Sequence, residues 1–512
     1  MIVGQSSPQH MAMIAKAGRS TLDDIFCRAA ARRPDAIALA DPPNRAAIAG
    51  GAPRRLTFAE ADRMISAVAV RLRRLGLGVD EVVGLQMANT VDAVVTLLGT
   101  LRAGLIAMPL PLLWRQAECV AALNRVGAKA LIVSGRIGSV DHCDLAMNIA
   151  AEVFQIRQVG GFGDNLPDGV IGFDDLYAAP AGEPPSAINR SVNPAAHVAA
   201  ITWDVGPDGL VPVARSHFEL LAAGAAIALE ARVEHNTILL TSLALPSLAG
   251  LAVGVIPWLL IGGTLALHHP FDDKVFLQQA RDEQCSVAVV PAALALQLEA
   301  SGALGRRGEI KTIVAAWRAP ERMAASAAWR DPVVGMVDVA AFGETGVLAT
   351  RRGGNGRPAL LALGPVTAPR GVPGALHVGE ISRTAAGTVG LRGPSVPKFP
   401  LPPEIDSVAK PAFAVGADGL ADTGFPCVVD PATGTLTLSG PPAGIVGVGG
   451  YRFAAQALGT LAAEVVPDGR IMPQPDALAG QRLAGSAPDA VRTREALAAR
   501  GVNPLIVAAF AA

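Results

Sequence analysis

The sequence has few cysteines and few aromatic residues. Its five cysteines are scattered over 512 residues, and none belongs to a CxxC pair or a cysteine–histidine cluster. This spacing argues against a disulfide framework and against a zinc site. The adjacent residues His268 and His269 are no metal pair, because neighbours on a strand point to opposite faces. The chain has no G-x-S-x-G motif, so it gives no support for an esterase.

Charge is scarce as well. Charged residues make up 17% of the chain, and the net charge is −1. This balance argues against a nucleic-acid partner and against a polybasic membrane anchor. The first 18 residues lack a basic head followed by a long apolar stretch, so we expect no signal peptide. The apolar fraction of 51% argues against disorder. We therefore expect a cytoplasmic, soluble protein of two or more domains.

One apolar run deserves comparison with a membrane span. Residues 237–267 contain no charged side chain, and the run is long enough to cross a bilayer. However, Pro246, Pro257 and four glycines divide it into short pieces. We therefore expect a buried helix followed by a buried strand, and no membrane span.

Short apolar strands alternate with helices in the early part of the chain. Thr57 and Glu60 have the spacing of a capping box at the start of an amphipathic helix. The strands are expected at 82–87, 104–110 and 128–135, and the helices at 56–77, 91–102 and around 117–125. This alternation predicts a doubly wound α/β domain, with a parallel sheet covered on both faces.

The segment ITWDVGPDGLVPVARSH, residues 201–217, lies between an expected strand and an expected helix. A loop at such a place often cradles phosphate at the helix N-terminus. Here Pro207 and Pro212 have no N–H to donate, and Asp204 and Asp208 would repel phosphate. The segment also has no lysine. We expect an ordered, turn-like loop that does not wrap an anion.

Several stretches resemble the adenylate-forming acyl-CoA synthetase family, which includes acyl-CoA ligases, peptide-synthetase adenylation domains and luciferases. The stretch from LTFAEADRM to GLIAMPL follows the family pattern in order and spacing, within a match over about residues 20–135. The resemblance returns at 238–302, at VGLRGPSV (389–396) and at GIVGVGGYRF (444–453). It therefore extends over most of the chain.

The resemblance implies a domain organisation. A large N-terminal AMP-binding-like domain, residues 1–440, would contain two doubly wound α/β subdomains and a β-rich subdomain at about 330–440. Residues 441–512 would form a short, truncated C-terminal domain.

The resemblance also implies a chemistry. Family members use ATP and Mg²⁺ to convert a carboxylate into an acyl-adenylate, and then pass the acyl group to a thiol, usually coenzyme A. The nucleotide-binding positions of the family correspond here to Thr202, Phe342, Glu344, Thr345 and Thr423. The same comparison makes Glu344 the residue that would hold Mg²⁺.

The motif AAFGETG can be aligned with the family in two ways. Aligned on the aromatic residue, Phe342 and Thr345 match, and Gly346 stands where the family has glutamate. Aligned from the other end, Glu344 is the glutamate, and Gly343 stands where the family has threonine.

Two further residues fall at the expected acyl pocket. Ser247 replaces a histidine that is frequent in the family, and Trp317 lies in AAWRAP, at the place of the family's GGAPL. For Trp317 the simpler interpretation as a core residue is favoured, because tryptophan is usually buried.

The family's charged residues have few counterparts here. Val211 falls near the loop lysine, and Phe425 replaces the aspartate that binds the ribose, where a phenyl ring cannot accept hydroxyl hydrogen bonds. The hinge reads GPPAGIVG, without arginine, aspartate or lysine. The last lysine of the chain is Lys410, so no lysine follows the hinge.

Two hypotheses follow from these departures. The chain is either an acyl-CoA synthetase-like ligase with a divergent site, or a catalytically inactive relative that binds an acyl group, a nucleotide or a partner protein. Under the first hypothesis, Arg215, Arg318 or Arg452 would replace the missing cations. The second hypothesis is compatible with a homo-oligomer or with pairing to an active homologue.

Overall fold

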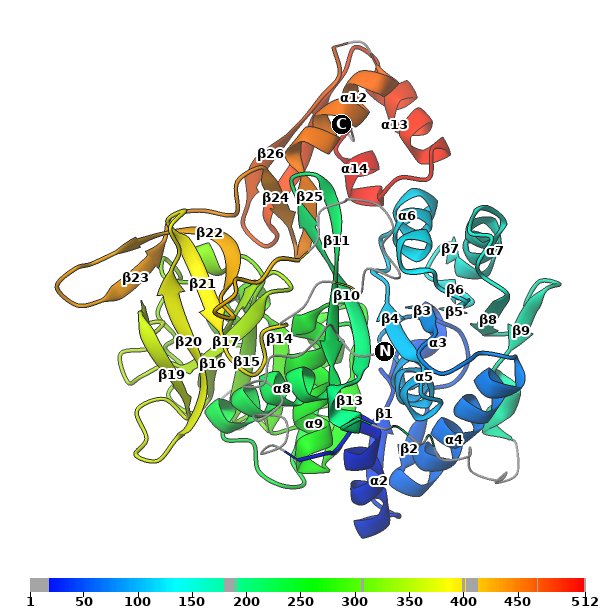
Figure 1. Cartoon of the computed structure of the whole chain (residues 1–512), viewed down its shortest axis with the longest axis horizontal. Coiled ribbons are helices and arrows are strands. Elements are labelled where there is room, and N and C mark those ends of the chain that lie inside the picture. The colour runs from blue at the N-terminus through cyan, green and yellow to red at the C-terminus, as the bar shows by residue number, and fades with distance from the viewer. Residues whose placement is uncertain are drawn as a thin grey trace.

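The structure is a computed structural model that describes residues 18–178, 188, 190, 192–304, 308–397, 401, 413–466 and 468–510. The region for which we expect no signal peptide, residues 1–17, lies outside the described residues. Within these ranges the chain forms three large sheets of eight, seven and six strands, with helices packed on the two larger ones (Figure 1).

The seven-stranded sheet contains the early strand–helix alternation. Its order is β11-β10-β4-β3-β5-β8-β9. The pairs from β10 to β9 are parallel, and only β10 and β11 are antiparallel, which confirms the predicted parallel arrangement. The strands are β3 (Val82–Gln86), β4 (Ile106–Pro109), β5 (Ala130–Ser134), β8 (Gln158–Phe162), β9 (Val170–Gly172), β10 (Val198–Gly206) and β11 (Gly209–Ser216).

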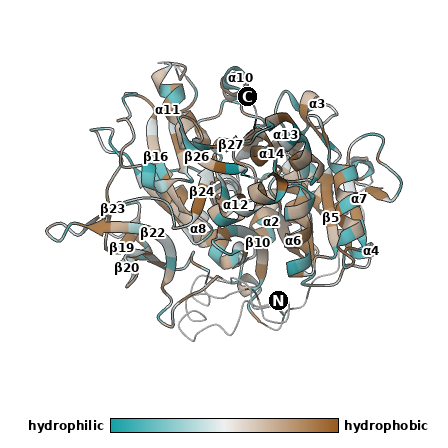
Figure 2. Cartoon of the chain, turned by 90° about the horizontal axis from the view of Figure 1, so that it is seen from above, coloured by the Kyte–Doolittle hydropathy of each residue, from teal (hydrophilic) through white to brown (hydrophobic). Residues whose placement is uncertain are grey.

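The helices of this part begin and end near the expected residues. Thr57 caps α4 in a complete capping box with Glu60, which satisfies donors that a helix start leaves free. Figure 2 shows the apolar colouring of β5 in the interior and polar positions on α4 and α7. The helices are α2 (Leu22–Arg32), α3 (Arg45–Ile48), α4 (Phe58–Arg74), α5 (Val91–Arg102), α6 (Gln116–Val126) and α7 (His142–Glu152).

The eight-stranded sheet has the order β17-β16-β15-β14-β12-β13-β1-β2, parallel from β16 to β1. Its strands are β1 (Ile37–Ala40), β2 (Arg55–Thr57), β12 (Ile238–Thr241), β13 (Thr264–Leu267), β14 (Val287–Pro291), β15 (Thr312–Trp317), β16 (Gly335–Phe342) and β17 (Gly346–Arg351). Its helices are α8 (His217–Ala231), the π-helix η3 (Gly250–Val255), α9 (Ile256–Ile261), α10 (Asp273–Asp282) and α11 (Ala292–Ala300).

The charge-free run 237–267 lies inside this part of the protein. It forms β12, η3, α9 and β13, and almost all of its apolar side chains are buried. None of the helices in the described ranges has the length and apolar character needed to cross a membrane. The prediction of a buried helix and strand is confirmed.

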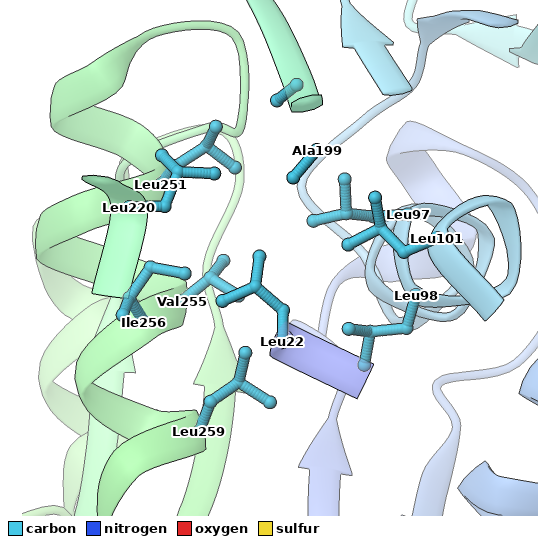
Figure 3. A pocket seen from close by; sticks show the side chains of 11 residues that line it. Leu22, Leu97, Leu98, Leu101, Ala199, Leu220, Leu251, Val255, Ile256 and Leu259 are labelled. Carbon is cyan, nitrogen blue, oxygen red and sulfur yellow. The ribbon is translucent and has the colours of Figure 1, made fainter. Parts of the chain in front are cut away.

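Helices from the two large sheets meet at an apolar contact. Figure 3 shows a small pocket at this contact, lined by eleven aliphatic side chains. Leu97 and Leu101 reach it from α5, Leu220 from α8, and Leu251 and Val255 from η3. Aliphatic packing of this kind fixes one sheet unit against the other through the hydrophobic effect.

The remaining strands form an antiparallel sheet and a separate C-terminal group. The six-stranded sheet comprises β18 (Leu361–Ala362), β19 (Gly364–Ala368), β20 (Leu376–Arg383), β21 (Thr388–Arg392), β22 (Ala421–Val429) and β23 (Thr435–Leu438). The C-terminal group comprises β24 (Ile445–Val448), β25 (Tyr451–Ala454), α12 (Ala455–Val465), β26 (Arg470–Asp476), β27 (Gly480–Ser486), α13 (Ala490–Ala499) and α14 (Pro504–Ala508).

The C-terminal group has a hydrophobic core of its own, whose buried members all lie between Val446 and Phe510. The boundary between residues 440 and 441 stays a prediction. In Figure 1 the group, in orange and red, lies beyond the end of the β10–β11 hairpin and next to α6.

The short elements outside these groups are β6 (Arg136–Ile137), β7 (Val140–Asp141), η1 (Asp174–Tyr177), η2 (Pro194–Ala196) and η4 (Pro320–Arg322).

Candidate functional site

The segment expected to be a loop is a β-hairpin. β10 continues to Gly206, which pairs with Gly209, so the turn contains only Pro207 and Asp208. The expectation of a turn-like loop over 202–212 is therefore wrong, because only residues 207 and 208 form the turn. β-Branched and aromatic residues on both sides of the turn favour strands. Gly209, the first residue after the two-residue turn, has φ +121°, a backbone conformation that glycine adopts readily. The ladder extends the segment away from the helix N-terminus at His217, where a phosphate-binding loop would lie.

Asp204 lies at the centre of the candidate site. Its Oδ1 accepts a hydrogen bond from Nη1 of Arg452 at 2.8 Å, and its Oδ2 accepts one from the backbone N–H of Glu344 at 2.8 Å. Gly343 makes this approach possible, because a Cβ at that position would lie 2.1 Å from Oδ2 of Asp204. Its φ of +57° also favours glycine. The hairpin is thus tied to two other segments through one carboxylate.

Arg215 brings Thr202 and Glu344 together. The arginine is fully buried, and its Nη1 donates to Oγ1 of Thr202 at 3.2 Å. Its guanidinium also donates to the backbone carbonyl of Glu344 and lies 3.8 Å from the carboxylate of that residue. Thr202 and Glu344, which the family resemblance assigns to the nucleotide, here contact a buried arginine of the same chain.

Glu344 is buried and already has a donor on its carboxylate. Its Oε2 accepts the backbone N–H of Leu248 at 2.7 Å. Burial raises the pKa of Glu344, and the charge of Arg215 opposes that shift. No group of three His, Cys, Asp or Glu side chains able to hold a metal occurs in the described ranges. The nearest other carboxylate, that of Asp204, also raises the pKa of Glu344 and is held by Arg452 and by the N–H of Glu344.

Ser247 and Arg318 form the next part of the cluster. Oγ of Ser247 accepts from Nη2 of Arg318 at 2.9 Å and from the backbone N–H of Gly250 at 2.9 Å. Nη1 of Arg318 donates to the carbonyl of Gly450 at 3.4 Å. Ser247 is thus next to Leu248, whose N–H holds Glu344, and Arg318 reaches the C-terminal group.

The aromatic residues at the site are packed against each other. The rings of Phe342 and Phe425 are 5.5 Å apart and perpendicular, and both side chains are buried. The guanidinium of Arg452 lies over the ring of Phe425, 5.3 Å from its centre. An edge-to-face pair with a cation over one ring is a stable arrangement.

Both threonines near these rings are buried. The hydroxyl of Thr423 donates to the carbonyl of Val389 at 2.7 Å. The backbone N–H of Thr345 donates to the carbonyl of Phe342 at 3.0 Å. The hydroxyl of Thr423 also accepts the backbone N–H of Phe425 at 3.3 Å, so Thr423 adjoins the cluster through Phe425.

Trp317 belongs to a different buried network. Its indole N–H donates to Oδ1 of Asp338 at 2.7 Å, and Oδ2 of Asp338 is 2.8 Å from Nε of Arg352. His268 also has partners in the core: its two ring nitrogens contact Gln279 and the N–H of Asp272. The structure thus joins Thr202, Ser247 and Glu344 in one cluster and places Trp317 outside it.

Sequence reasoning did not identify the pairing of Asp204 with Arg452 or the part played by Gly343. The two ion-pair partners are 248 positions apart, and no local pattern links residues at that separation. The nearest signal was Gly343 in AAFGETG, because glycine allows a positive φ and a close approach of another group to the backbone.

Comparison with known proteins agrees with the motifs. The family model described as AMP-binding enzyme matches residues 26–359. The chain is 28% identical over 284 residues to a 2-hydroxy-7-methoxy-5-methyl-1-naphthoate–CoA ligase of Streptomyces carzinostaticus, covering 54% of this chain and 49% of that protein. It is 24% identical over 278 residues to the medium-chain fatty-acid–CoA ligase of Escherichia coli K12, covering 52% and 46%. The chain thus aligns with about half the length of these relatives.

Solved structures resemble nearly the whole chain. The amide bond synthetase McbA from Marinactinospora thermotolerans has a TM-score of 0.70 at 18% identity, covering 95% of this chain and 94% of its own. MbtA of Mycobacterium smegmatis, in its apo form, has a TM-score of 0.63 at 19% identity, covering 98% and 93%. At these identities the likeness shows the fold alone.

Proposed function

The chain belongs to the AMP-binding enzyme family, and we propose that it is a member that binds a small anionic ligand without forming an acyl-adenylate. The main observation against adenylate formation is the position of the carboxylate of Asp204. It lies on the hairpin that replaces the phosphate-binding loop, and it is bound to Arg452 and to the N–H of Glu344. Phosphate groups at that place would face a negative charge where the family has backbone N–H donors and a lysine.

The position expected for the ribose supports the same proposal. Phe425 is buried against Phe342 and under Arg452. A ribose at this place would displace an aromatic contact and find no acceptor for its hydroxyls. An aspartate at position 425, as in the family pattern, would lie in the apolar core.

The residues present do not fit Mg²⁺ well. Magnesium prefers several oxygen ligands in an octahedral arrangement, whereas the carboxylate of Glu344 already binds Arg215 and the N–H of Leu248. The neighbouring carboxylate of Asp204 is bound to Arg452 and to the N–H of Glu344. A divalent cation would have to displace the guanidinium of Arg215 or approach close to it. We therefore derive no catalytic step through ATP and Mg²⁺.

A second candidate function is ATP-dependent carboxylate activation with transfer to coenzyme A. One observation favours it: Arg215, Arg318 and Arg452 converge near Glu344. Three guanidinium groups could together replace the charge of the family's lysines. This candidate would use Thr202, Phe342, Glu344, Thr345 and Thr423 for the nucleotide, and Ser247 and Trp317 for the acyl group.

Pyrophosphate exchange separates the two candidates. The assay measures acid-dependent incorporation of labelled pyrophosphate into ATP, with short, long and aromatic acids. We expect a rate at least about 10³-fold below that of an active family member, because loss of one preorganised donor costs about 10²–10³ and such losses do not simply multiply. Robust exchange that Arg215→Ala or Arg452→Ala abolishes would establish the second candidate. Calorimetric titration with ATP and Mg²⁺ tests binding independently.

A cytoplasmic location and an association with another chain belong to the same proposal. An inactive member can act by pairing with itself or with an active homologue. Light scattering after size exclusion measures the first directly, and a monomer at all concentrations would contradict the homo-oligomer.

A further inference from the structure

We propose that the outer part of the β10–β11 hairpin, residues 203–212, is a strap that fixes the C-terminal group against the rest of the protein. The strap holds these two parts in one arrangement, with or without a ligand. This inference goes beyond the proposed function, because it concerns how the two parts can move and not what they bind.

The strap projects from the sheet to which β10 belongs. β10 pairs with β4 at Ala200, and its pairing with β11 continues as far as Gly206 and Gly209. The residues of β10 are buried up to Thr202 and half-buried after it. Figure 1 shows the hairpin running from the sheet toward the C-terminal group. A two-stranded ribbon is only marginally stable by itself, so the position of the strap depends on its side-chain contacts.

Both strands of the strap are anchored near α6. The ring of Trp203 lies edge to face with the ring of Trp114, with 6.2 Å between their centres. On the other strand, the carbonyl of Leu210 accepts a hydrogen bond from Nη1 of Arg125 at 2.5 Å. Trp114 lies just before α6, and Arg125 lies in its last turn. The strap is therefore held in place before it reaches the C-terminal group.

Asp204 connects the two parts of the protein through its two oxygen atoms. Oδ2 accepts the backbone N–H of Glu344, just before β17, and Oδ1 accepts from Nη1 of Arg452, on β25. Both distances are 2.8 Å. Since such hydrogen bonds extend to about 3.2 Å, the C-terminal group cannot turn away from the strap without breaking the ion pair.

The turn of the strap lies against the segment that leads into the C-terminal group. A Cβ added to Gly444 would lie 3.9 Å from Cβ of Pro207, and one added to Gly424 would lie 3.3 Å from Cβ of Pro442. The carbonyl of Gly444 accepts the N–H of Ala455 at 2.8 Å. Proline also fixes its own φ. The connecting segment is thus packed on the strap and has little freedom to rotate.

The C-terminal group contacts the rest of the protein at two further places. Nη1 of Arg318 donates to the carbonyl of Gly450 at 3.4 Å. Gly501 lies next to α6, where an added Cβ would be 3.5 Å from Cβ of Gln116. Contacts at several separate places restrict rotation as well as translation, so the strap acts on a group that already has a defined seat.

Measurement of the distance between two spin labels on the full chain tests the proposal. The labels are attached through Phe154→Cys and Val491→Cys, at positions that are 91% and 57% exposed and lie in the two different parts. Cys27→Ser removes the one exposed cysteine of the five. We expect a single narrow distance distribution, unchanged by millimolar ATP and Mg²⁺. A broad or two-peaked distribution, or a shift of the peak with ATP, would overturn the proposal.

Two variants in the labelled protein release the strap from opposite sides. Arg452→Met removes the ion pair but leaves the hydrogen bond between Asp204 and the N–H of Glu344 in place. Asp204→Ala removes both contacts. We expect loss of the single narrow peak in each variant, at an unchanged near-ultraviolet circular dichroism spectrum for Arg452→Met. The matched control, Asp208→Ala, removes an exposed carboxylate from the turn of the same hairpin and should keep the narrow peak. A narrow, unshifted peak in both Arg452→Met and Asp204→Ala would show that the hairpin is no strap.

Discussion

Asp204 and Arg452 form an ion pair across 248 positions of the chain, with Oδ1 of the aspartate 2.8 Å from Nη1 of the arginine. The aspartate belongs to the β10–β11 hairpin and the arginine to β25. The contact therefore connects the rebuilt phosphate-loop segment with the C-terminal group. Such a contact would favour one arrangement of these two parts of the protein.

A double-mutant cycle of Asp204→Asn and Arg452→Met should give a coupling energy of about 1–3 kcal/mol in urea unfolding. The side chains are only 18% and 14% exposed, so water screens the pair weakly. The control is the pair Glu464 and Arg500, which is 59% and 46% exposed and should give about 0–1 kcal/mol. Equal coupling energies in both cycles would mean that the Asp204–Arg452 pair stabilises the protein no more than an exposed ion pair does.

Gly343→Ala should lower the free energy of unfolding by about 1–3 kcal/mol. The backbone there has φ +57°, and the new Cβ would meet Oδ2 of Asp204 at 2.1 Å. Gly354→Ala is the control, because a Cβ at that position meets no atom within 4 Å. A neutral effect of Gly343→Ala on urea unfolding would show that Asp204 does not approach the backbone of Glu344 in solution.

Much of the fold could be predicted from local sequence patterns. The capping box of Thr57 and Glu60 and the apolar alternation placed α4 and the parallel strands correctly, because caps and periodicity act over a few residues. The prediction for the proline- and glycine-containing segment after Thr202 was wrong. Its local composition indicates a loop, but pairing with β4 through Ala200 and Ala107 adds it to a sheet, and that is a tertiary effect.

The candidate site depended even more on distant partners. Sequence reasoning named Arg215, Arg318 and Arg452 as available cations, but not their partners. Arg318 meets Ser247 from 71 positions away, and Arg215 meets Glu344 from 129 positions away. Such pairs follow from the order of strands in the sheets, which composition and spacing do not determine. The family resemblance identified the positions, and only the structure identified the contacts.

The buried His217 should make stability depend on pH. Its Nδ1 accepts the backbone N–H of Leu22 at 3.2 Å, and burial, helped by Arg190, lowers its pKa from 6.5 to about 3. Between these values the unfolded chain binds the proton and the folded chain does not. The contribution is therefore complete above about pH 6.5 and is lost as the pH falls, by up to about 1.4 kcal/mol per pH unit.

Urea unfolding of the wild type and His217→Gln at pH 6.5 and pH 5 checks this dependence. Glutamine keeps an acceptor for Leu22 but has no proton to gain, so the variant should show the shallower slope. Other buried histidines such as His142, with a pKa lowered to about 4 by burial, contribute equally to both proteins. Equal slopes would mean that His217 is protonated without unfolding.

Phe425→Asp should destabilise the protein and should not create a nucleotide site. Phe425 is 1% exposed, and its ring packs at a right angle on Phe342 and under Arg452. Removing a buried ring costs about 3–5 kcal/mol, and an aspartate left in this apolar place adds the cost of a buried polar group. Phe425→Leu removes the aromatic contact but keeps an apolar side chain, so it should lose less stability.

Thermal unfolding ranks the stability of the two variants, and titration with ATP then measures nucleotide binding to the folded protein. If Phe425→Asp is as stable as the wild type and gains affinity for ATP, the position is open to ligand, and the buried ring is no obstacle to a ribose.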